Sequence, residues 1–411
     1  MTFRRPFLLI VAALALSLTA AGTALADRAG RQLLRDAFAQ AGIETEAAEA
    51  KVALLDEIVE KLAERHVDRI DSLLLGQRAA AAIGAAPGDA EQDFDAAVAA
   101  LTAALDPYTT YLDPGEWDDL RVSISGRFSG IGVELALKDQ MVTVIAPIDG
   151  SPAAEAGVQP DDRILAVDDE PTAKMSLSQV VGRLRGPEGQ PVRVRVRGGD
   201  GSERSLTLVR NLIRMQPVKA RLEGDVAYVR ISQFSGGAAA LLRAHLLDLD
   251  RQAAFGVKGI VLDLRRNPGG LLDEAVKMAD LFLENVAIVS VRGREPAEDD
   301  HHRGRAGEIL AGIPMAVLID GASASAAEIL AAALHDNGRA RLIGQNSYGK
   351  GSVQALEKLS RGGVRVTVAR DFRPNDQPID GVGIAPDETV SPAEGGDAPL
   401  RRALAVVRAE Q

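Results

Sequence analysis

The 411-residue sequence contains no cysteine and one tryptophan, and only 3% of its residues are aromatic. The missing thiols exclude disulfide bonds, cysteine nucleophiles and thiolate metal sites. Because 46% of the residues are apolar while aromatic side chains are scarce, the core must be packed mainly by Ala, Leu, Val and Ile. The formal net charge of −11 argues against a nucleic-acid-binding surface. Past the N-terminus, no stretch of the sequence is long and apolar enough to span a bilayer.

The N-terminus has the features of a secretory signal. Arg4-Arg5 precedes an apolar run over residues 7–18, and Ala24-Leu25-Ala26 forms a small-x-small cleavage site. We therefore predict that residues 1–26 are a cleaved signal peptide and that the mature protein is periplasmic or secreted. The alternative is an uncleaved membrane anchor, for which the run is short and rich in Ala. The two arginines also resemble part of a twin-arginine signal, which leaves the export route open.

Residues 27–120 are predicted to form a helical region followed by a connector. Apolar residues recur at helical spacing in two runs, Val52, Leu55, Ile58, Val59 and Leu62, then Phe94, Ala97, Val98, Leu101 and Leu105. Such stripes indicate a hydrophobic core, and the alternative is a subunit interface. Asp106-Pro107 ends the second run, and the two prolines of residues 106–114 predict a structured connector. Taken alone, this connector has no feature that distinguishes it from an inert loop.

Residues 121–210 consist of short β-like runs separated by turn signals. Their order and the pattern Ser151-Pro-Ala…Asp162-Arg-Ile-Leu-Ala-Val167 resemble a PDZ domain. The resemblance implies that a peptide adds to the domain as a strand and that backbone N–H groups of a glycine-rich loop bind its terminal carboxylate. The corresponding loop and groove positions are Gly130, Ile131, Gly132, Val180, Val181 and Leu184. The alternative is that the glycines only form a bulge.

Residues 211–392 change to alternating strand and helix patterns, which predict parallel crossovers and a sheet covered by helices. Polar residues 293–311 are expected to form an exposed loop, and residues 393–411 a tail with a short helix. The whole chain is thus predicted to be a multidomain α/β protein.

One segment of this α/β region has the pattern of a catalytic turn. Apolar residues 314–319 predict a buried strand, and residues 326–336 a helix that ends at Asn337-Gly338. Ser325 should therefore lie at a strand-to-helix turn, where the first backbone N–H groups of the helix are free to bind negative charge. The alternative is that these small residues only allow close packing.

Lys350 lies between two glycines at the start of the next β-like run. Only nine of the 47 basic residues are Lys, so a Lys at this position suggests a role that Arg cannot fill. A desolvated Lys can give up its proton, and a neutral Lys serves as the general base of a nucleophilic Ser in a known variant of the Ser-His-Asp arrangement. The alternative is a turn with a solvated Lys.

The order of a helical region, a PDZ domain and an α/β core resembles the carboxyl-terminal processing proteases, a family of exported serine peptidases. The matching segments are Leu112-Asp-Pro114, Phe128-Ser-Gly-Ile-Gly-Val-Glu134, Asp263-Leu-Arg-Arg-Asn-Pro-Gly-Gly270, Ser323-Ala-Ser-Ala-Ala-Glu-Ile329, Tyr348-Gly-Lys-Gly-Ser-Val-Gln354 and Gly381-Val-Gly-Ile-Ala-Pro-Asp387. The resemblance implies a crotonase- or ClpP-like protease core and a reaction that needs neither metal nor cofactor.

The resemblance also assigns roles to residues. Ser325 would be the nucleophile, with Ser323 as the competing candidate, Lys350 the general base, and Gln354 the residue that holds the lysine. The oxyanion hole would use the N–H of Ala326 and that of Gly269 or Gly270. As a base at neutral pH, Lys350 would need burial away from carboxylates to lower its pKa by about 3 units from about 10.4. None of the five His falls in a Ser-His-Asp motif.

We expect partners to be protein substrates held by their C-termini, with an adaptor or activator protein and a homodimer suggested by the family. Nucleic acid is not expected. A non-catalytic PDZ adaptor is the main alternative, although the complete Ser, Lys and Gln set argues against it. An acyl-transfer or hydratase enzyme on a crotonase-like core is a third reading, and it would leave the PDZ domain unexplained.

Overall fold

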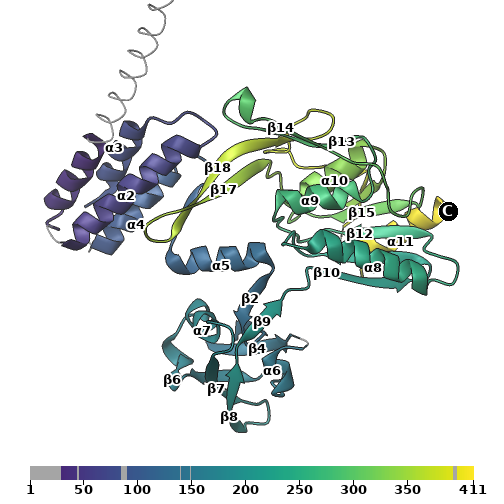
Figure 1. Ribbon diagram of the computed structural model, residues 1–411, viewed down its shortest axis with the longest axis horizontal. Helices are drawn as coiled ribbons and strands as arrows, with labels where there is room; N and C mark the ends of the chain where they lie inside the picture. The colour runs from purple at the N-terminus through teal and green to yellow at the C-terminus, as the bar shows by residue number, and fades with distance from the viewer. Residues whose placement is uncertain (1–28, 44–45, 85–89, 139, 149, 392–395) are drawn as a thin grey trace, which may run out of the picture.

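The computed structural model describes residues 29–411 except 44–45, 85–89, 139, 149 and 392–395. The predicted signal peptide therefore lies outside the described residues. Figure 1 shows three regions: a helical region at one end, a larger α/β region at the other, and a small β-rich domain below helix α5. A long hairpin of two strands, β17 and β18, crosses the space between the two ends.

The helical region packs around a single core, as the apolar stripes predict. Its helices are residues 29–40, α2 (Glu46–Arg65), α3 (Ser72–Ala82) and α4 (Ala90–Thr102). The two stripes meet in one cluster with apolar residues of the hairpin β17 (Ser352–Lys358) and β18 (Gly363–Phe372), namely Leu359, Val364 and Val366. The helical region is thereby tied to the α/β region through this hairpin.

The connector after α4 is a strand of a sheet and not an inert loop. Its β1 (Thr110–Leu112) pairs antiparallel with β18. The following helix α5 (Pro114–Ser125) begins with a capping box between Asp113 and Glu116 and ends at Gly126, which adopts a left-handed conformation. Pairing with a strand that lies more than 250 residues downstream is tertiary information that local turn chemistry cannot supply.

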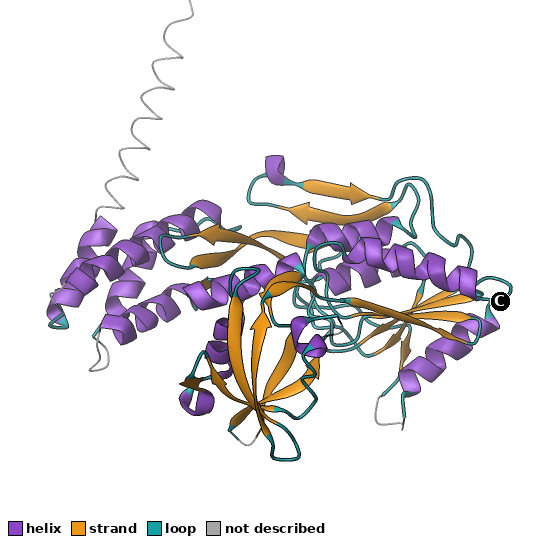
Figure 2. Ribbon diagram, turned by 60° about the horizontal axis from the view of Figure 1, so that its bottom comes forward, coloured by secondary structure: helices purple, strands orange, loops and turns teal. Residues whose placement is uncertain are grey.

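The small domain has the predicted PDZ-like order of elements. Strands β2 (Arg127–Gly130) and β9 (Asn211–Arg214) pair where the chain enters and leaves it. Between them lie β3 (Val133–Lys138), β4 (Met141–Pro147), β5 (Arg163–Val167), β6 (Glu170–Pro171), β7 (Pro191–Arg197), β8 (Glu203–Val209), the helices α6 (Pro152–Glu155) and α7 (Leu177–Leu184), and the 3₁₀ turn η1 (Thr172–Lys174). Figure 2 shows the strongly curved sheet of this domain in front of the rest of the molecule. Along β7, buried Val192, Val194 and Val196 alternate with arginines.

The α/β region is built on a six-stranded sheet in the order β10-β11-β12-β15-β16-β19. Its strands are β10 (Val218–Glu223), β11 (Val226–Ile231), β12 (Gly259–Asp263), β15 (Met315–Ile319), β16 (Arg341–Gly344) and β19 (Glu388–Thr389). All neighbours after β11 are parallel, whereas β10 and β11 are antiparallel. Helices lie between the parallel strands from β11 to β16, as the alternation in the sequence predicts, whereas the chain between β16 and β19 forms strands β17 and β18.

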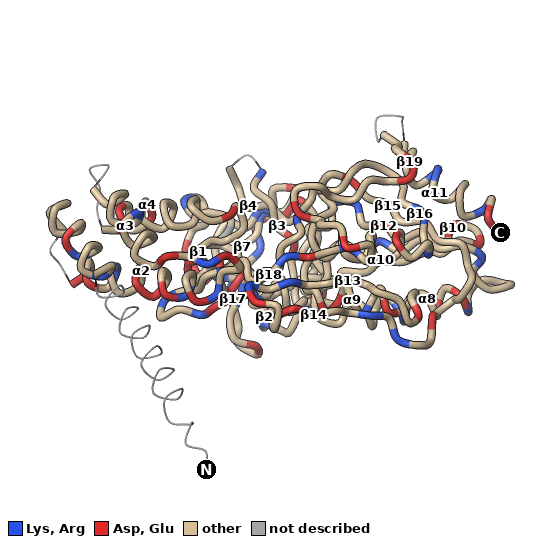
Figure 3. Tube along the Cα trace, turned by 90° about the horizontal axis from the view of Figure 1, so that it is seen from above, with Lys and Arg blue, Asp and Glu red and all other residues tan. Residues whose placement is uncertain are grey.

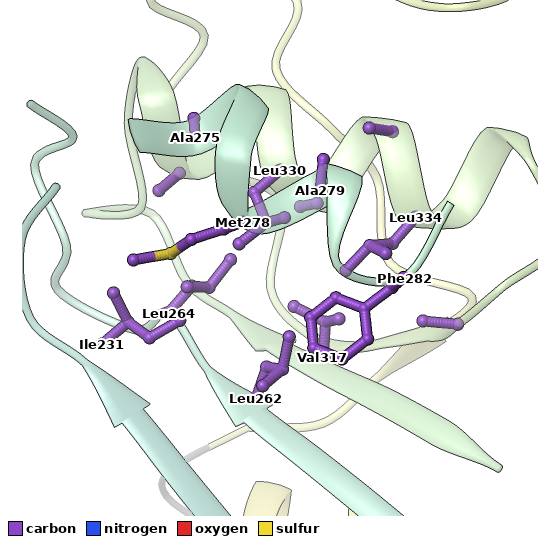
Figure 4. Packing of buried hydrophobic residues seen from close by; sticks show 14 of the residues in the cluster. Ile231, Leu262, Leu264, Ala275, Met278, Ala279, Phe282, Val317, Leu330 and Leu334 are labelled. Carbon is purple, nitrogen blue, oxygen red and sulfur yellow. The ribbon is translucent and has the colours of Figure 1, made fainter. Parts of the chain in front are cut away.

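Helices cover both faces of this sheet. One face carries α8 (Ala238–Gln252), α9 (Leu272–Asp280) and α10 (Ala326–Asp336), and the other carries the C-terminal α11 (Ala398–Ala409). In Figure 4, Met278 of α9 and Leu330 of α10 pack above Leu262 and Val317 of the central strands. These strands are buried throughout, which is typical of a parallel sheet between helices.

Residues 293–311 are mostly exposed, as predicted, but the prediction that they form a loop is wrong. This segment contains the 3₁₀ turn η2 (Pro296–Glu298) and strand β14 (Asp300–Arg303), which pairs antiparallel with β13 (Ala287–Arg292). The second sheet of the region runs β1-β18-β13-β14, with β17 also paired to β18. The polarity of β14 reflects an exposed edge strand, which the sequence alone cannot distinguish from a loop.

Acidic and basic residues are interspersed along all three regions (Figure 3). Ion pairs form accordingly between neighbouring elements: Arg265, just after β12, pairs with buried Asp263 and with Asp397 at the start of α11. Within the described part of the chain, no helix is both long and apolar enough to cross a membrane.

Candidate active site

Ser325 occupies the predicted turn between β15 and α10. Its backbone has φ +55° and ψ −120°, a conformation that side-chain-bearing residues rarely adopt. The side chain is half-buried, and the next residue, Ala326, begins the helix. Such strain at a strand-to-helix turn exposes a serine hydroxyl beside the free N–H groups of the helix.

Ser323 is ruled out as the nucleophile by its contacts. Its side chain is fully buried; Oγ donates to the carbonyl of Leu264 at 2.9 Å and accepts from the N–H of Asp320 at 2.9 Å. These hydrogen bonds give it a structural role, since they tie the turn to the end of β12. Ser325 is therefore the serine whose hydroxyl is available.

The loop between β12 and α9 lies directly against Ser325. A Cβ atom placed on Gly269 would be 2.8 Å from the Cβ of Ser325, so only glycine allows this approach. The loop is held by Asn267, whose side chain donates to the carbonyl of Ile231 at 2.9 Å and accepts from the N–H of Gly269 at 2.8 Å. Asn267 had no individual role predicted from the sequence, although it lies within a family motif.

The two oxyanion candidates of this loop differ. The N–H of Gly269 is already bonded to Asn267, whereas the N–H groups of Gly270 and Ala326 have no hydrogen-bond acceptor among the residues that the structure describes. Gly270 is also sterically required, because a Cβ atom there would come within 2.3 Å of the carbonyl oxygen of Phe234. In this arrangement Gly270 and Ala326 are the donors free to bind an anion.

A fully buried carboxylate, Glu328, joins the two halves of the site. Its Oε2 accepts from the N–H of Ser325 and from that of Lys350, both at 2.8 Å. Its Oε1 accepts from the N–H of Gly349 at 2.7 Å and from the hydroxyl of Ser347 at 2.5 Å. From the sequence, Glu328 had no role beyond its place in a family motif; the signal that could have found it is its third position in the helix, where a carboxylate reaches back to the N–H of the residue that precedes the helix.

Lys350 lies just before β17, in a partly buried position between Gly349 and Gly351. Burial lowers the pKa of Lys350 from its ordinary value, and the charge of Arg365 lowers it further. The expected isolation from carboxylates is not found, because Asp106, Asp371 and Glu328 act in the opposite direction and raise this pKa. The net direction still favours a base.

The side chains of Ser325, Lys350 and Gln354 are not joined in this arrangement. No hydrogen bond connects any two of these three side chains, all of which the structure describes. Lys350 Nζ instead lies 4.8 Å from the centre of the Tyr108 ring. The amide nitrogen of Gln354 donates to the hydroxyls of Thr367 at 2.9 Å and Ser352 at 3.2 Å, while its buried oxygen has no partner.

The candidate peptide groove of the small domain contains most of its predicted residues. Gly130, Ile131, Gly132, Val181 and Leu184 line one pocket together with Phe128 and Arg185. The prediction that Val180 lines the groove is wrong, because this residue is fully buried in the core of the domain. On the short helix α7, Val180 and Val181 are adjacent and so cannot face the same side.

The described residues contain no cluster of three or more His, Asp or Glu arranged to hold a metal ion. His66 hydrogen-bonds to Asp106 at 2.9 Å, and His335 lies between Asp336 and Asp387. In none of these hydrogen bonds does a histidine contact Ser325.

Comparisons with known proteins match this architecture. Residues 225–390 match the model of peptidase family S41, and residues 143–198 match a PDZ domain. The carboxy-terminal-processing protease of Bartonella bacilliformis is 38% identical over 305 residues, which cover 74% of this chain and 70% of the relative. The carboxyl-terminal-processing protease of Synechocystis sp. is 39% identical over 304 residues, covering 72% and 70%.

Among solved structures, a photosystem II D1 C-terminal processing protease is 28% identical, with a TM-score of 0.51, and covers 84% of this chain and 94% of its own. A putative S41 protease from Bacteroides fragilis, 17% identical with a TM-score of 0.50, shares the fold.

Proposed function

Because this chain belongs to the carboxyl-terminal processing proteases of peptidase family S41 and is a serine peptidase with a PDZ domain, we propose that it is an exported endopeptidase that captures protein C-termini and cleaves them with Ser325 and Lys350. The observation that carries the proposal is the Glu328 carboxylate, which hydrogen-bonds to the backbone N–H of both residues at 2.8 Å. One buried group thus sets the relative position of nucleophile and base.

The chemistry follows from these positions. Neutral Lys350 takes the proton of the Ser325 hydroxyl as its oxygen attacks the peptide carbonyl, and later gives that proton to the leaving amine. The N–H groups of Gly270 and Ala326 stabilise the charge on the tetrahedral intermediate. Water then hydrolyses the acyl-enzyme in the same way. Each oxyanion donor of this kind contributes about 3–4 kcal/mol to transition-state stabilisation.

Gln354 is proposed to hold Lys350 in the working arrangement. Its buried side-chain oxygen has no partner in the present arrangement, and a lysine amine is a suitable donor for it. Ser352 and Gln354 alternate along β17, and Lys350 precedes Ser352 by the same spacing of two residues, which favours a common direction for the three side chains. If the Lys350 side chain shifts from Tyr108 toward Ser325, its amine gains the Gln354 oxygen as an acceptor, and that oxygen gains a donor.

The PDZ domain is proposed to bind the free carboxylate of the substrate next to Gly130 and Gly132 and to receive the chain as an added strand beside Val181 and Leu184. An adaptor or activator protein and a homodimer remain proposals drawn from the family. For export, the N-terminal sequence of the mature protein recovered from producing cells tests the prediction, which requires it to begin at Asp27.

The test of the mechanism is cleavage of an unfolded reporter with an apolar C-terminus. We expect Ser325→Ala and Lys350→Arg each to lower kcat by at least about 10³-fold, since Arg keeps the charge but cannot act as a base. Lys358→Arg is the matched control, because it makes the same exchange at the exposed end of β17, the strand that follows Lys350. Blocking the reporter's terminal carboxylate as an amide should raise KM.

Cleavage by Ser325→Ala would contradict the assignment of the nucleophile. A wild-type protein that binds the reporter's C-terminus but never cleaves it would instead support the non-catalytic adaptor.

A further inference from the structure

The part of the connector just before β1 contacts the candidate general base directly. Lys350 Nζ lies 4.8 Å from the centre of the Tyr108 ring, within the range of a cation–π contact. The backbone that carries this ring is held by Arg365, whose Nε donates to the carbonyl of Tyr108 at 3.1 Å. The ring is therefore placed against Lys350 by the hairpin itself.

Asp106 anchors the same connector with both oxygens. Its Oδ1 accepts from the N–H groups of Tyr108 at 2.8 Å and Thr109 at 2.9 Å, and its Oδ2 accepts from Thr109 Oγ1 at 2.7 Å and from His66 Nε2 at 2.9 Å. Burial alone raises the pKa of Asp106, but the hydrogen bonds from His66, Thr109 and Tyr108 outweigh it and hold this pKa well below its usual range. Asp106 is thus a constant anion and a fixed anchor.

The anchor also reaches the third residue of the proposed site. Thr367 Oγ1 donates to Asp106 Oδ1 at 3.0 Å and accepts from Gln354 Nε2 at 2.9 Å. The connector consequently holds Lys350 through Tyr108 and Gln354 through Asp106 and Thr367. In the proposed mechanism Lys350 acts on Ser325, and Gln354 holds Lys350.

We propose that Tyr108 is a positioning residue of the active site, whose ring holds the Lys350 ammonium in the arrangement seen here, and that Lys350 must leave this ring before it can serve Ser325. The inference rests on the Ser-Lys mechanism proposed above. It makes the N-terminal connector part of the catalytic site.

The physical reason is that the ring and the reaction require opposite forms of the lysine. The face of an aromatic ring attracts the charged ammonium, whereas a general base must be the neutral amine. The other groups that act on Lys350 come from several elements: Arg365 lowers its pKa, and Asp106, Asp371 and Glu328 raise it. A cavity of about 400 Å³ adjoins the ring and is lined by Tyr108, His66, Asp106, Tyr348 and Arg370 among other residues.

The decisive variants are Tyr108→Leu and Tyr108→Phe in the full-length protein. Leu keeps an apolar group at the position but removes the ring, whereas Phe keeps the ring and loses only the hydroxyl. The pKa of Lys350 can be followed from its ε-carbon resonance in protein labelled with ¹³C-lysine, assigned by its loss in Lys350→Arg. We expect this pKa to fall by about one unit in Tyr108→Leu and to return toward the wild-type value in Tyr108→Phe.

Activity gives a second readout that a purely structural role would not change in this way. In Tyr108→Leu the acidic limb of the kcat–pH profile should shift to lower pH by about one unit, as the pKa of Lys350 does. The value of kcat at pH 7 should then rise up to about tenfold, while KM changes little. Tyr111→Leu is the matched control: this second connector tyrosine packs edge-on against Phe94, with ring centres 5.5 Å apart. It should lose packing without moving the pKa of Lys350.

The outcomes separate this inference from the proposed function. An unchanged Lys350 pKa in Tyr108→Leu, an equal change in Tyr108→Phe, or the same change in Tyr111→Leu overturns the role of Tyr108, whether or not the reporter is cleaved. If the pKa moves as expected but no protein cleaves the reporter, the contact is established and the Ser-Lys mechanism fails. A fall in kcat at an unmoved pH profile also overturns the inference.

Discussion

Replacing Glu328 with Gln tests the group on which the whole site depends. In the wild type, four donors converge on one buried carboxylate: the N–H groups of Ser325, Gly349 and Lys350 and the hydroxyl of Ser347. A glutamine of the same shape presents one oxygen and one NH₂ group. Whichever way it is oriented, the NH₂ group faces two donors that have lost their acceptor.

The expected cost follows from the number of hydrogen bonds lost. Two hydrogen bonds to a charged acceptor disappear, at about 1.5–3 kcal/mol each, which predicts a loss of about 3–6 kcal/mol in the free energy of unfolding. The lower end applies if the NH₂ group turns toward Ser347, whose hydroxyl can also accept. Even then, displacement of Gly349 moves the neighbouring Lys350, and a misplacement of about 1 Å is enough to lower kcat about 10²-fold.

Denaturant unfolding measures the first effect as a shift of the midpoint at constant slope, and reporter cleavage measures the second. Glu274→Gln is the matched control, since Glu274 is also buried and accepts from the N–H of Ala239 at 2.8 Å and from Lys277 at 3.0 Å, neither of which belongs to the candidate site. It should lower stability and leave kcat unchanged. Wild-type stability and wild-type kcat in Glu328→Gln would refute the reasoning.

Three further predictions concern single positions. Gly269→Ala should lower kcat about 10²-fold or more, because the added Cβ atom would lie 2.8 Å from the Cβ of Ser325. Labelling of Ser325 by a fluorophosphonate measures this loss, and labelling at the wild-type rate would contradict the prediction. Burial raises the pKa of Asp371 from 3.8 to about 7, so the folded state favours the neutral acid. The stability of the wild type relative to Asp371→Asn should therefore fall by up to about 4 kcal/mol between pH 4 and pH 7 and stay constant above pH 7. Parallel unfolding curves for the two proteins over this range would contradict the raised pKa. Val181→Glu should weaken the binding of an apolar C-terminal peptide at least about tenfold in a titration without changing the unfolding midpoint. The same change at buried Val180 should instead destabilise the domain.

Much of the fold could be predicted because its signals are local. The alternation of strand and helix patterns predicted the parallel sheet, and the apolar stripes of α2 and α4 predicted the core of the helical region. The failures share a cause. Strand β14 is polar because it lies at an edge, β1 gains its structure from β18, and Val180 lies one position away from the groove residue Val181. In each case the partner, and not the segment itself, decides the outcome.

The sequence by itself determined which residue types can carry the reaction and on which elements they lie. Ser325 at a strand-to-helix turn and Lys350 between two glycines follow from neighbours within a few positions, because turn and helix propensities act over that range. Only the tertiary structure decided what their side chains contact. The bond between Thr367 and Asp106 joins positions 261 residues apart, and the ring of Tyr108 reaches Lys350 across a similar separation. No local pattern records such distances, since they are set by the packing of the helical region against the β17–β18 hairpin.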